Sequence, residues 1–397
     1  VYFFSKQHIL AIFFLFLCDM KRFFLFGLLW MALLTVGCRE SRPFSADDFT
    51  VERYTPRHAT GFDIRSREGS RSSLISVRNP WQGGAGEVQY LYVVRDGERV
   101  PARFPGQVVE APVRRVVCMS SSFVAMFDLL GEVERIVGVS GIDFIANEYV
   151  ATHRQCGEVR DVGFDSNLNF ELMVAMRVDL VLLYGVAGED TAVTGKLREL
   201  GIPYIYIGDY VEESPLGKAE WMMVIAELTD CMERGRELFD ATCARYEALR
   251  DGVKPGVRPT VMLNTPYRDT WYLPSTKSYM VRLIEDAGGR FVYSGNTGNA
   301  SLPVEIEEAY LLTNQADYWL NTGAANTLRE LTSQNPRFAT VPAVRDGRVF
   351  NNNRRQTPAG GSDFWESGVV RPDRVLADLL RIFEGRSDSL FYYKKLE

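Results

Sequence analysis

Three consecutive serines at positions 120–122 directly follow the short apolar run of residues 116–118. A serine that follows a strand can act as a nucleophile, but the G-x-S-x-G sequence typical of that arrangement is missing. A histidine base would have to be His58 or His153, because His8 belongs to the N-terminal leader, and both lie in stretches with little predicted structure. The chain also has no GxxxxGK[ST] or GxGxxG phosphate-binding loop. These observations predict a protein that is not an enzyme.

Aromatic and arginine side chains that follow predicted strands are the best candidates for ligand binding, because ligands of parallel sheets bind at the carboxyl ends of the strands. Aromatic rings offer flat, rigid area to a large planar or lipophilic ligand, and arginines pair with the negatively charged groups of a ligand. Arg354 and Arg355 stand in an asparagine-rich loop, where they have no obvious packing role. The alternative for the other candidates is core packing or loop anchoring. The predicted ligand-binding residues are Ser121, Ser122, Tyr184, Gly185, Tyr267, Arg268, Trp271, Tyr272, Arg354, Arg355 and Trp365.

The histidines and cysteines do not form a metal-binding pattern. A site for a bare zinc or manganese ion needs histidines and carboxylates from both halves of the chain, and no histidine follows residue 153. No CxxC pair occurs, which argues against a zinc site built from thiolates. Haem ligation by two histidines is poorly supported, while a tyrosine ligand remains open. We therefore predict no metal site and no cofactor. Cys118 is interpreted as a small core residue, and a disulfide among Cys156, Cys231 and Cys243 is possible but cannot be assigned.

The elements that must position these residues alternate between strand and helix patterns. Residues 114–141 contain an apolar run, a segment of helical spacing that Gly131 closes, and a second apolar run, which together form the βαβ pattern of a parallel sheet. The alternation continues to residue 207 and restarts at residue 260. Between these points, residues 215–251 keep a helical pattern that is long for a globular domain. The predicted fold is α/β, with two lobes that contain central parallel sheets, are joined by one long rigid helix, and enclose a ligand cleft.

The N-terminal stretch is much more apolar than the rest of the chain. The run 23–37, preceded by Lys21-Arg22, has the anatomy of a secretory signal peptide. It is shorter than the roughly 20 residues that a transmembrane helix needs. It ends in LTVGC, which resembles a bacterial lipobox with Cys38 as the residue that receives lipid. Met20 is interpreted as the start, so that residues 1–19 are not translated. We predict a periplasmic protein that a lipid anchors to a membrane of the cell envelope.

Composition and charge limit the possible partners. A hydrophobic fraction of 46% and a charged fraction of 24% are ordinary for a globular protein. The formal net charge of −6 leaves no basic excess to neutralise phosphates, so no nucleic acid is expected as a partner.

The stretch from residue 112 to 383 resembles the periplasmic substrate-binding proteins of ABC importers for iron-siderophores, haem and corrinoids, the class whose lobes are joined by a helical backbone. The motifs that carry the resemblance are RRVVCMSSSFVAMFDLLGEVERIVGVSG, LNFELMVAMRVDLVLLYG, the helix at 215–251, VEIEEAYLLTNQADYWLNTG and AVRDGRVFNNN. The Asn-Pro-Trp turn at 79–81 and the ending GGSDFWESGVVRPDRVLADLL are similar to a version found in Bacteroidetes-type bacteria. The expected parts are a signal peptide at 1–37, a tether at 38–60, a small β-rich preface at 61–111, an N-terminal lobe at 112–214, a spine helix at 215–255 and a C-terminal lobe at 256–397.

The resemblance implies partners and a mode of docking. In the family, one exposed glutamate on each lobe docks to arginines of the membrane permease, and the matching positions are Glu171 and Glu307. A glutamate in the first turn of a helix also complements the helix dipole, which is the alternative for either residue alone. The implied partners are an ABC permease with its ATPase, a metal-chelate or corrinoid ligand, and the membrane through the lipid. A surface lipoprotein that holds or relays haem or cobalamin without a permease is the alternative function.

Overall fold

The structure is a computed structural model that describes residues 44–164, 167–186, 188–268 and 270–397. The chain divides into two compact units, the first comprising residues 1–45 and 101–104 and the second residues 46–100 and 105–397. In the first unit, Phe44 and Phe104 pack edge to face with ring centroids 5.0 Å apart. The predicted signal peptide and Cys38 lie outside the described residues. Within the described ranges, no helix is both long and apolar enough to cross a membrane.

The second unit begins with a five-stranded sheet of order β1-β2-β3-β4-β5, which we call the N-terminal sheet. Its first four strands pair antiparallel, whereas β5 pairs parallel to β4. The sheet matches the predicted β-rich preface but starts earlier, inside the predicted tether at 38–60, because Phe49 is buried and β1 pairs with β2. The strands are β1 (Val51–Tyr54), β2 (Phe62–Ser66), β3 (Ser73–Arg78), β4 (Val88–Val94) and β5 (Gln107–Glu110).

The N-lobe, which comprises β6 to β10 and their helices, is built on a parallel sheet of order β10-β9-β6-β7-β8. Its central strands are buried along their whole length, which explains their uninterrupted apolar sequences. Helix α2 starts at Ser120, whose hydroxyl caps it by accepting the N–H of Ser122, and ends at Gly131 with a φ of 72°. The elements are β6 (Val116–Cys118), α2 (Ser121–Leu130), β7 (Ile136–Val139), α3 (Glu148–Cys156), β8 (Arg160–Asp161), α4 (Phe170–Ala175), β9 (Leu180–Leu183), α5 (Thr191–Glu199) and β10 (Tyr204–Tyr206).

The C-lobe, which comprises β11 to β17 and the helices α9 to α12, repeats this arrangement. Its sheet has the order β13-β11-β15-β16-β17, with β17 antiparallel to β16. Since β11 lies between β13 and β15 as β6 lies between β7 and β9, strand β15 corresponds to β9. Strands β12 and β14, which the sequence analysis did not predict, form an antiparallel pair. The elements are β11 (Thr260–Leu263), β12 (Thr270–Leu273), α9 (Tyr279–Asp286), β13 (Arg290–Phe291), β14 (Leu302–Glu305), α10 (Ile306–Thr313), β15 (Tyr318–Leu320), α11 (Leu328–Gln334), α12 (Pro342–Arg345), β16 (Val349–Asn351) and β17 (Lys394–Lys395).

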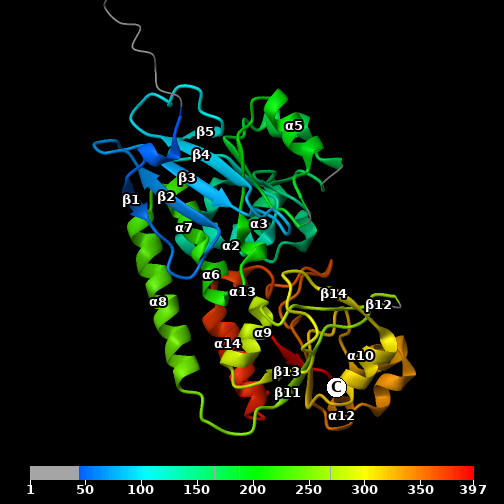
Figure 1. Ribbon diagram of the computed structural model, residues 1–397. Helices are drawn as coiled ribbons and strands as arrows, with labels where there is room; N and C mark the ends of the chain where they lie inside the picture. Colours follow the sequence, from blue (N-terminus) through cyan, green and yellow to red (C-terminus); the bar gives the residue numbers. More distant parts are fainter. Residues whose placement is uncertain (1–43, 165–166, 187, 269) are drawn as a thin grey trace, which may run out of the picture. The chain divides into compact units, whose positions relative to one another are not determined.

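The helical connection between the lobes is not one helix, as predicted, but three: α6 (Pro215–Glu220), α7 (Met222–Leu228) and α8 (Met232–Asp251). The break before α8 occurs where Asp230 has a φ of 63°, and there the hydroxyl of Thr229 donates to the carbonyl of Ile225. Helix α8 alone has 20 residues and so spans about 30 Å. The C-terminal helices α13 (Ser367–Val370) and α14 (Pro372–Phe383) return along this connection, and Figure 1 shows α14 beside α8.

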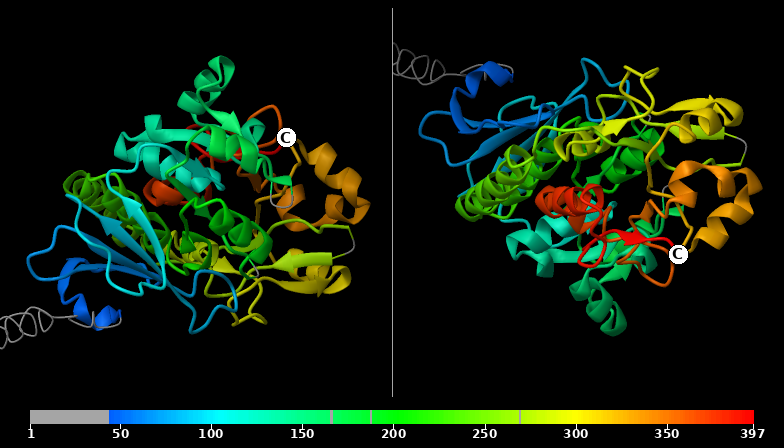
Figure 2. Two further views of the ribbon diagram at one scale, coloured as in Figure 1. Left: turned by 90° about the horizontal axis from the view of Figure 1, so that it is seen from above. Right: turned by 90° about the horizontal axis from the view of Figure 1, so that it is seen from below.

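Three buried glutamates attach the N-terminal sheet to α6, to α7 and to the segment that precedes α6. Glu220 accepts hydrogen bonds from the hydroxyl of Tyr54 at 2.7 Å and from the backbone N–H groups of residues 57, 58 and 59 at 2.7–2.8 Å. Glu227 is fully buried and pairs with the buried Arg95 at 2.8 Å. Glu212 accepts the N–H groups of residues 60 and 61. Figure 2 shows this sheet, blue to cyan, beside the green helices. The residues of the predicted tether from 46 onward therefore belong to the folded body.

Candidate functional site

The carboxyl ends of strands from both lobes border an inner cavity of about 220 Å³. The N-lobe contributes Tyr210, which follows β10, and the C-lobe contributes Asn264 after β11 and Asn321 after β15. Trp365 lines it from the loop between β16 and α13. This is the place where ligands bind in parallel α/β sheets, since the strand ends carry the variable loops.

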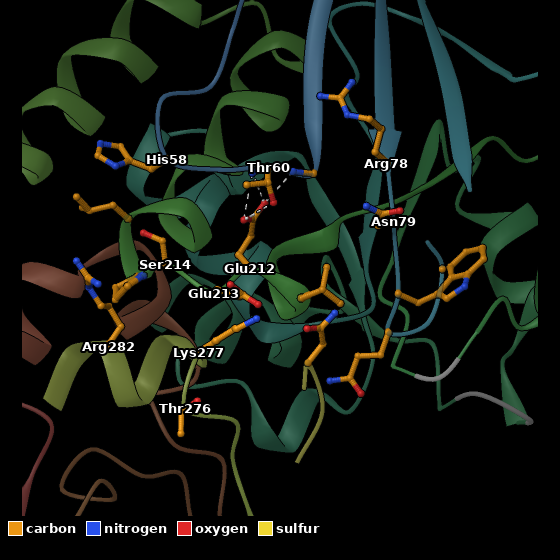
Figure 3. Close-up of a pocket in the computed structure, with 18 of the residues that line it drawn as sticks. His58, Thr60, Arg78, Asn79, Glu212, Glu213, Ser214, Thr276, Lys277 and Arg282 are labelled. Atoms are coloured by element: carbon orange, nitrogen blue, oxygen red, sulfur yellow. Dashed lines mark hydrogen bonds between the residues drawn. The ribbon is translucent and has the colours of Figure 1, made fainter. Parts of the chain in front are cut away.

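A larger outer cavity of about 780 Å³ adjoins the inner one, because six residues line both. The shared residues are Gln82, Val211, Glu212, Glu213, Lys277 and Asn299. Figure 3 shows the outer cavity, with Arg78 and Asn79 from the N-terminal sheet on one side and Thr276, Lys277 and Arg282 from the C-lobe on another. The two cavities together form a cleft that we call the interlobe cleft.

Two asparagines at the floor of the cleft share an unusual backbone conformation. Asn264 and Asn321 each follow a buried strand in the sequence Leu-Asn-Thr, and their φ angles are 64° and 59°. The two strands, β11 and β15, are neighbours, so the asparagines lie at the same edge of the sheet. The left-handed conformation costs energy for a residue with a side chain and is concentrated at functional sites. Neither asparagine is among the predicted ligand-binding residues, although the repeated Leu-Asn-Thr after two predicted strands is a signal that could have found them.

Exposed aromatic side chains gather at the strand ends. Among the described residues, seven aromatic side chains are exposed. Six of them lie in the segments that follow β7, β8, β9, β10, β11 or β16, and the seventh, Tyr272, is on β12. Tyr210 is 47% exposed and Trp365 is 46% exposed. The six rings at the strand ends indicate a surface that a ligand covers, whereas Tyr272 lies on the separate β12–β14 pair and is not part of that surface. The set comprises Phe144, Phe164, Tyr184, Tyr210, Tyr267, Tyr272 and Trp365.

Three buried polar atoms just after strands of the C-lobe sheet have no described hydrogen-bond partner. The hydroxyl of Thr322, the amide nitrogen of Asn352 and the amide oxygen of Asn353 have no hydrogen-bond partner within the described part of the chain. All three residues follow β15 or β16 directly. Buried polar groups are normally satisfied, so this end of the C-lobe sheet holds unused hydrogen-bonding capacity.

Comparison with known proteins identifies the family. The family model described as periplasmic binding protein matches residues 116–353, which is more than half of the chain. The chain belongs to the periplasmic binding protein family. The predicted family and fold class are thereby confirmed, and both describe binding proteins rather than enzymes. The match begins at β6, so the N-terminal sheet lies outside it.

The periplasmic binding protein described here has relatives among archaeal proteins. An uncharacterized lipoprotein of Methanocaldococcus jannaschii is 25% identical over 307 residues, which cover 73% of this chain and 71% of the relative. A second uncharacterized lipoprotein of the same organism is 23% identical over 403 residues, covering 94% of this chain and all of the relative.

Solved structures share the fold. A possible iron-binding periplasmic protein of Staphylococcus epidermidis has a TM-score of 0.53 at 19% identity and covers 68% of this chain and 99% of its own. A periplasmic haem-binding protein of Pseudomonas aeruginosa has a TM-score of 0.53 at 18% identity, covering 72% and 98%. The periplasmic vitamin B12-binding protein of Vibrio cholerae has a TM-score of 0.51 at 14% identity, covering 70% and 99%.

Two of the predicted ligand-binding residues are structural instead. Trp271 is fully buried, and its indole N–H donates to the carbonyl of Leu263 at 2.9 Å, so the prediction for Trp271 is wrong. Its strand β12 turns this side chain into the core and leaves Tyr272 48% exposed. Ser122 is also buried, and its hydroxyl lies 2.9 Å from that of Ser120 at the cap of α2. Both side chains are inaccessible because packing and helix capping already use them.

The adjacent arginines behave differently from each other. Arg355 pairs with Asp363 at 2.5 Å and lies over the ring of Phe391, so the expectation that it has no packing role is wrong. Arg354 is exposed, and no described carboxylate lies within ion-pair distance of it. Only Trp365 among the eleven predicted residues lines either cavity in the described structure. The others that remain accessible lie outside both: Ser121, Tyr184, Tyr267, Arg268, Tyr272, Arg354 and Arg355.

Gly185 has a packing role that its sequence position did not reveal. A side chain added at Gly185 would place its Cβ 2.9 Å from the Cβ of Trp81 and 3.3 Å from the carbonyl oxygen of Pro80. Gly185 therefore leaves the space at the end of β9 into which Trp81 packs.

Carboxyl groups near the cleft have raised pKa values because they are buried. Burial raises the pKa of Glu212, although its hydrogen bonds with residues 60 and 61 and with the indole of Trp221 oppose the shift. Glu366 links the lobes by accepting the N–H of Ala146 at 2.8 Å. Burial raises the pKa of Glu366 to about 8, and nearby Asp363 adds to the increase. At neutral pH the protonated form of Glu366 is therefore favoured in the folded protein.

The two predicted docking glutamates occupy corresponding places in the two lobes. Glu171 is exposed in the first turn of α4, which precedes β9, and Glu307 lies in the first turn of α10, which precedes β15. The side chain of Glu307 is 70% exposed and lies 3.9 Å from the guanidinium of Arg337. Four cysteines are free in the described chain, so none of the possible disulfides forms there: Cys118, Cys156, Cys231 and Cys243.

Proposed function

We propose that this protein captures an iron chelate, such as an iron-siderophore or haem, or a corrinoid in the interlobe cleft and delivers it to the permease of an ABC importer. The observation that carries this proposal is the cleft itself, which combines the strand ends of two lobes with aromatic rings from both. Tyr210 from the N-lobe and Trp365 from the C-lobe line the inner cavity, and each is about half exposed. Such rings suit a large ligand with flat or lipophilic faces.

The similar structures support this choice of ligand. Three of them are described as a possible iron-binding protein, a haem-binding protein and a vitamin B12-binding protein, and two of these ligands, haem and vitamin B12, are large metal complexes. The family match supports a role in transport. The lipoprotein relatives support an anchor at Cys38, which would keep the cleft next to the membrane that holds the permease.

The placement of Glu171 and Glu307 supports their proposed role in docking. Two exposed carboxylates at corresponding positions of two lobes can set the orientation of the protein on a permease with two matching basic patches. The connection through α6, α7 and α8, with α14 packed beside it, supports a small movement of the lobes on ligand binding rather than a wide hinge closure. Small-angle scattering with and without ligand is expected to give nearly the same radius of gyration, and a large compaction would contradict the rigid connection.

The direct test is a ligand titration of the purified soluble protein that begins at residue 44. Hemin, cyanocobalamin and ferrichrome are added in turn, and binding is followed by tryptophan fluorescence and absorbance. We expect one of these probes to bind, and we expect Tyr210→Ala to weaken it by about tenfold or more, as is typical of aromatic residues in a ligand pocket. Tyr272→Ala is the matched control, because Tyr272 is equally exposed and lies outside both cavities. Equal affinity of both variants would contradict the cleft as the binding site.

A further inference from the structure

A loop of the N-terminal sheet reaches the interlobe cleft, although that sheet lies outside the family match at 116–353. The loop connects β3 and β4, and we call residues 79–86 the β3–β4 loop. Its own hydrogen bonds give it a defined form. The N–H of Asn79 donates to the carbonyl of Glu87 at 3.0 Å, the N–H of Gly86 donates to the side chain of Asn79 at 3.0 Å, and the N–H of Gly84 donates to the carbonyl of Trp81 at 3.1 Å.

Trp81 fixes the loop to the N-lobe. Its ring packs edge to face on Tyr206 of β10, with centroids 5.2 Å apart. Its Cβ occupies the space above Gly185, at the carboxyl end of the neighbouring strand β9. Burial of Tyr206 raises its pKa to about 12, consistent with a ring that the loop covers. The loop is therefore held at the strand ends where ligands of such sheets bind.

Gln82 follows Trp81 and lines both the inner and the outer cavity. We propose that the β3–β4 loop is a side wall of the interlobe cleft and that Gln82 contacts the ligand and contributes to its selection. This inference rests on the proposed function, and it adds a specificity determinant from a part of the chain that the family match does not include. Gln82 and Trp365 both line the inner cavity, so one ligand held there can touch both, and Gln82 also faces any part of the ligand that extends into the outer cavity.

The groups that line the outer cavity indicate which chemical groups the periphery of the ligand, here called its rim, should carry. The three arginines that line it are already paired with carboxylates: Arg78 with Asp63, Arg250 with Asp251 at 3.0 Å and Arg282 with Asp286 at 3.2 Å. Lys277 also lines this cavity, but so do the carboxylates of Glu212, Glu213 and Glu285, so the lining has no excess of positive charge to attract the carboxylates of a ligand. The uncharged hydrogen-bonding groups there come from Thr60, Asn79, Gln82, Ser214, Thr276 and Asn299. An amide both donates and accepts hydrogen bonds, so Gln82 fits a ligand whose rim carries uncharged amide or hydroxyl groups better than one with free carboxylates.

The test compares three probes that differ in the chemical groups at their periphery. Cyanocobalamin carries amides, ferrichrome is an uncharged peptide chelate, and hemin carries two carboxylates. We expect the wild-type protein to bind cyanocobalamin or ferrichrome more tightly than hemin. Gln82→Ala is expected to weaken the bound amide-bearing probe by about three- to tenfold, the effect of one hydrogen bond, with an unchanged melting temperature. Gln334→Ala is the matched control, since Gln334 is exposed and lines neither cavity.

Three variants test how the loop is anchored. Trp81→Ala should weaken binding more than Gln82→Ala, because it frees the loop from Tyr206, whereas Trp81→Phe should retain most of the affinity. Gly185→Ala should act like Trp81→Ala, since the added methyl group displaces the loop. Hydrogen exchange of residues 79–86 reports the displacement without any ligand. Unchanged hydrogen exchange of residues 79–86 in Gly185→Ala would refute the proposal that Trp81 anchors the loop at Gly185.

The outcomes separate this inference from the proposed function. A wild-type protein that binds none of the three probes overturns the proposed function and the ligand role of the loop together. If Tyr210→Ala weakens binding but Gln82→Ala and Trp81→Ala bind like the wild type, the interlobe cleft remains the binding site, and the proposal that the β3–β4 loop forms its side wall is refuted. If hemin is the preferred probe, or if Gln82→Ala weakens hemin as much as the amide-bearing probes, the uncharged rim is overturned.

Discussion

Removal of the Glu220 carboxylate should detach the N-terminal sheet from the helices that join the lobes. Glu220 is fully buried and accepts four hydrogen bonds, one from the hydroxyl of Tyr54 and three from backbone N–H groups at residues 57–59. Each donor left without a partner costs about 1–3 kcal/mol when it stays buried. Because water can reach some of these half-buried donors, we take the low end of that range for each. Glu220→Ala should therefore lower the free energy of unfolding by about 4 kcal/mol.

The assay is guanidinium denaturation of the wild type and the variant, together with hydrogen exchange of the amides at 57–59. The exchange of these amides should accelerate even in native conditions, because Glu220 is their acceptor. Glu237→Ala is the control, since Glu237 is exposed on α8 and its loss should change stability by less than about 0.5 kcal/mol. A loss below about 1 kcal/mol for Glu220→Ala, with unchanged exchange at 57–59, would refute the attachment.

Three further predictions concern the lobes. The pKa of Glu366 is about 8 in the folded protein and near 4.5 in the unfolded chain, so the free energy of unfolding should fall as pH rises through this window, by up to ~5 kcal/mol from this group. Glu366→Gln should flatten that slope in denaturation curves between pH 5 and 9, and an unchanged slope would exclude Glu366 as its source. Trp271→Ala should cost about 3–5 kcal/mol in thermal or chemical denaturation, as for other buried aromatic residues, while Tyr272→Ala should cost less than about 1 kcal/mol. The double variant Glu171→Ala with Glu307→Ala should abolish uptake in cells yet bind ligand like the wild type; equal loss of binding would place these residues in the pocket.

Much of the fold could be predicted because it depends on local pattern. Fully buried parallel strands need continuous apolar residues, and β6, β7, β9, β11 and β15 lie where such runs occur. Helix α2 begins and ends at the cap residues Ser120 and Gly131, which are short-range signals. The long helical segment was mispredicted as continuous because its break at residues 229–231 contains neither glycine nor proline.

The site was harder to predict because it depends on contacts between distant segments. A strand's alternation shows that neighbouring side chains face opposite ways, but not which face meets the core. Which of Trp271 and Tyr272 is buried was therefore decided by the tertiary structure. With β12 paired to β14, Trp271 packs against Trp319, with ring centroids 5.5 Å apart. Likewise, Arg355 forms its ion pair with Asp363 because the loop after β16 folds back on itself, and this fold could not be predicted from the sequence.

The sequence by itself determined the α/β class, the repeated lobes and the family, because these follow from hydrophobic periodicity and motifs within short stretches. The tertiary structure alone decided which side chains border the interlobe cleft. Gln82 and Trp365 are 283 positions apart in the chain, yet both line the inner cavity. Their meeting depends on the buried glutamates that attach the N-terminal sheet and on Trp81 seated at Gly185, and such long-range packing leaves no periodic signal in the sequence.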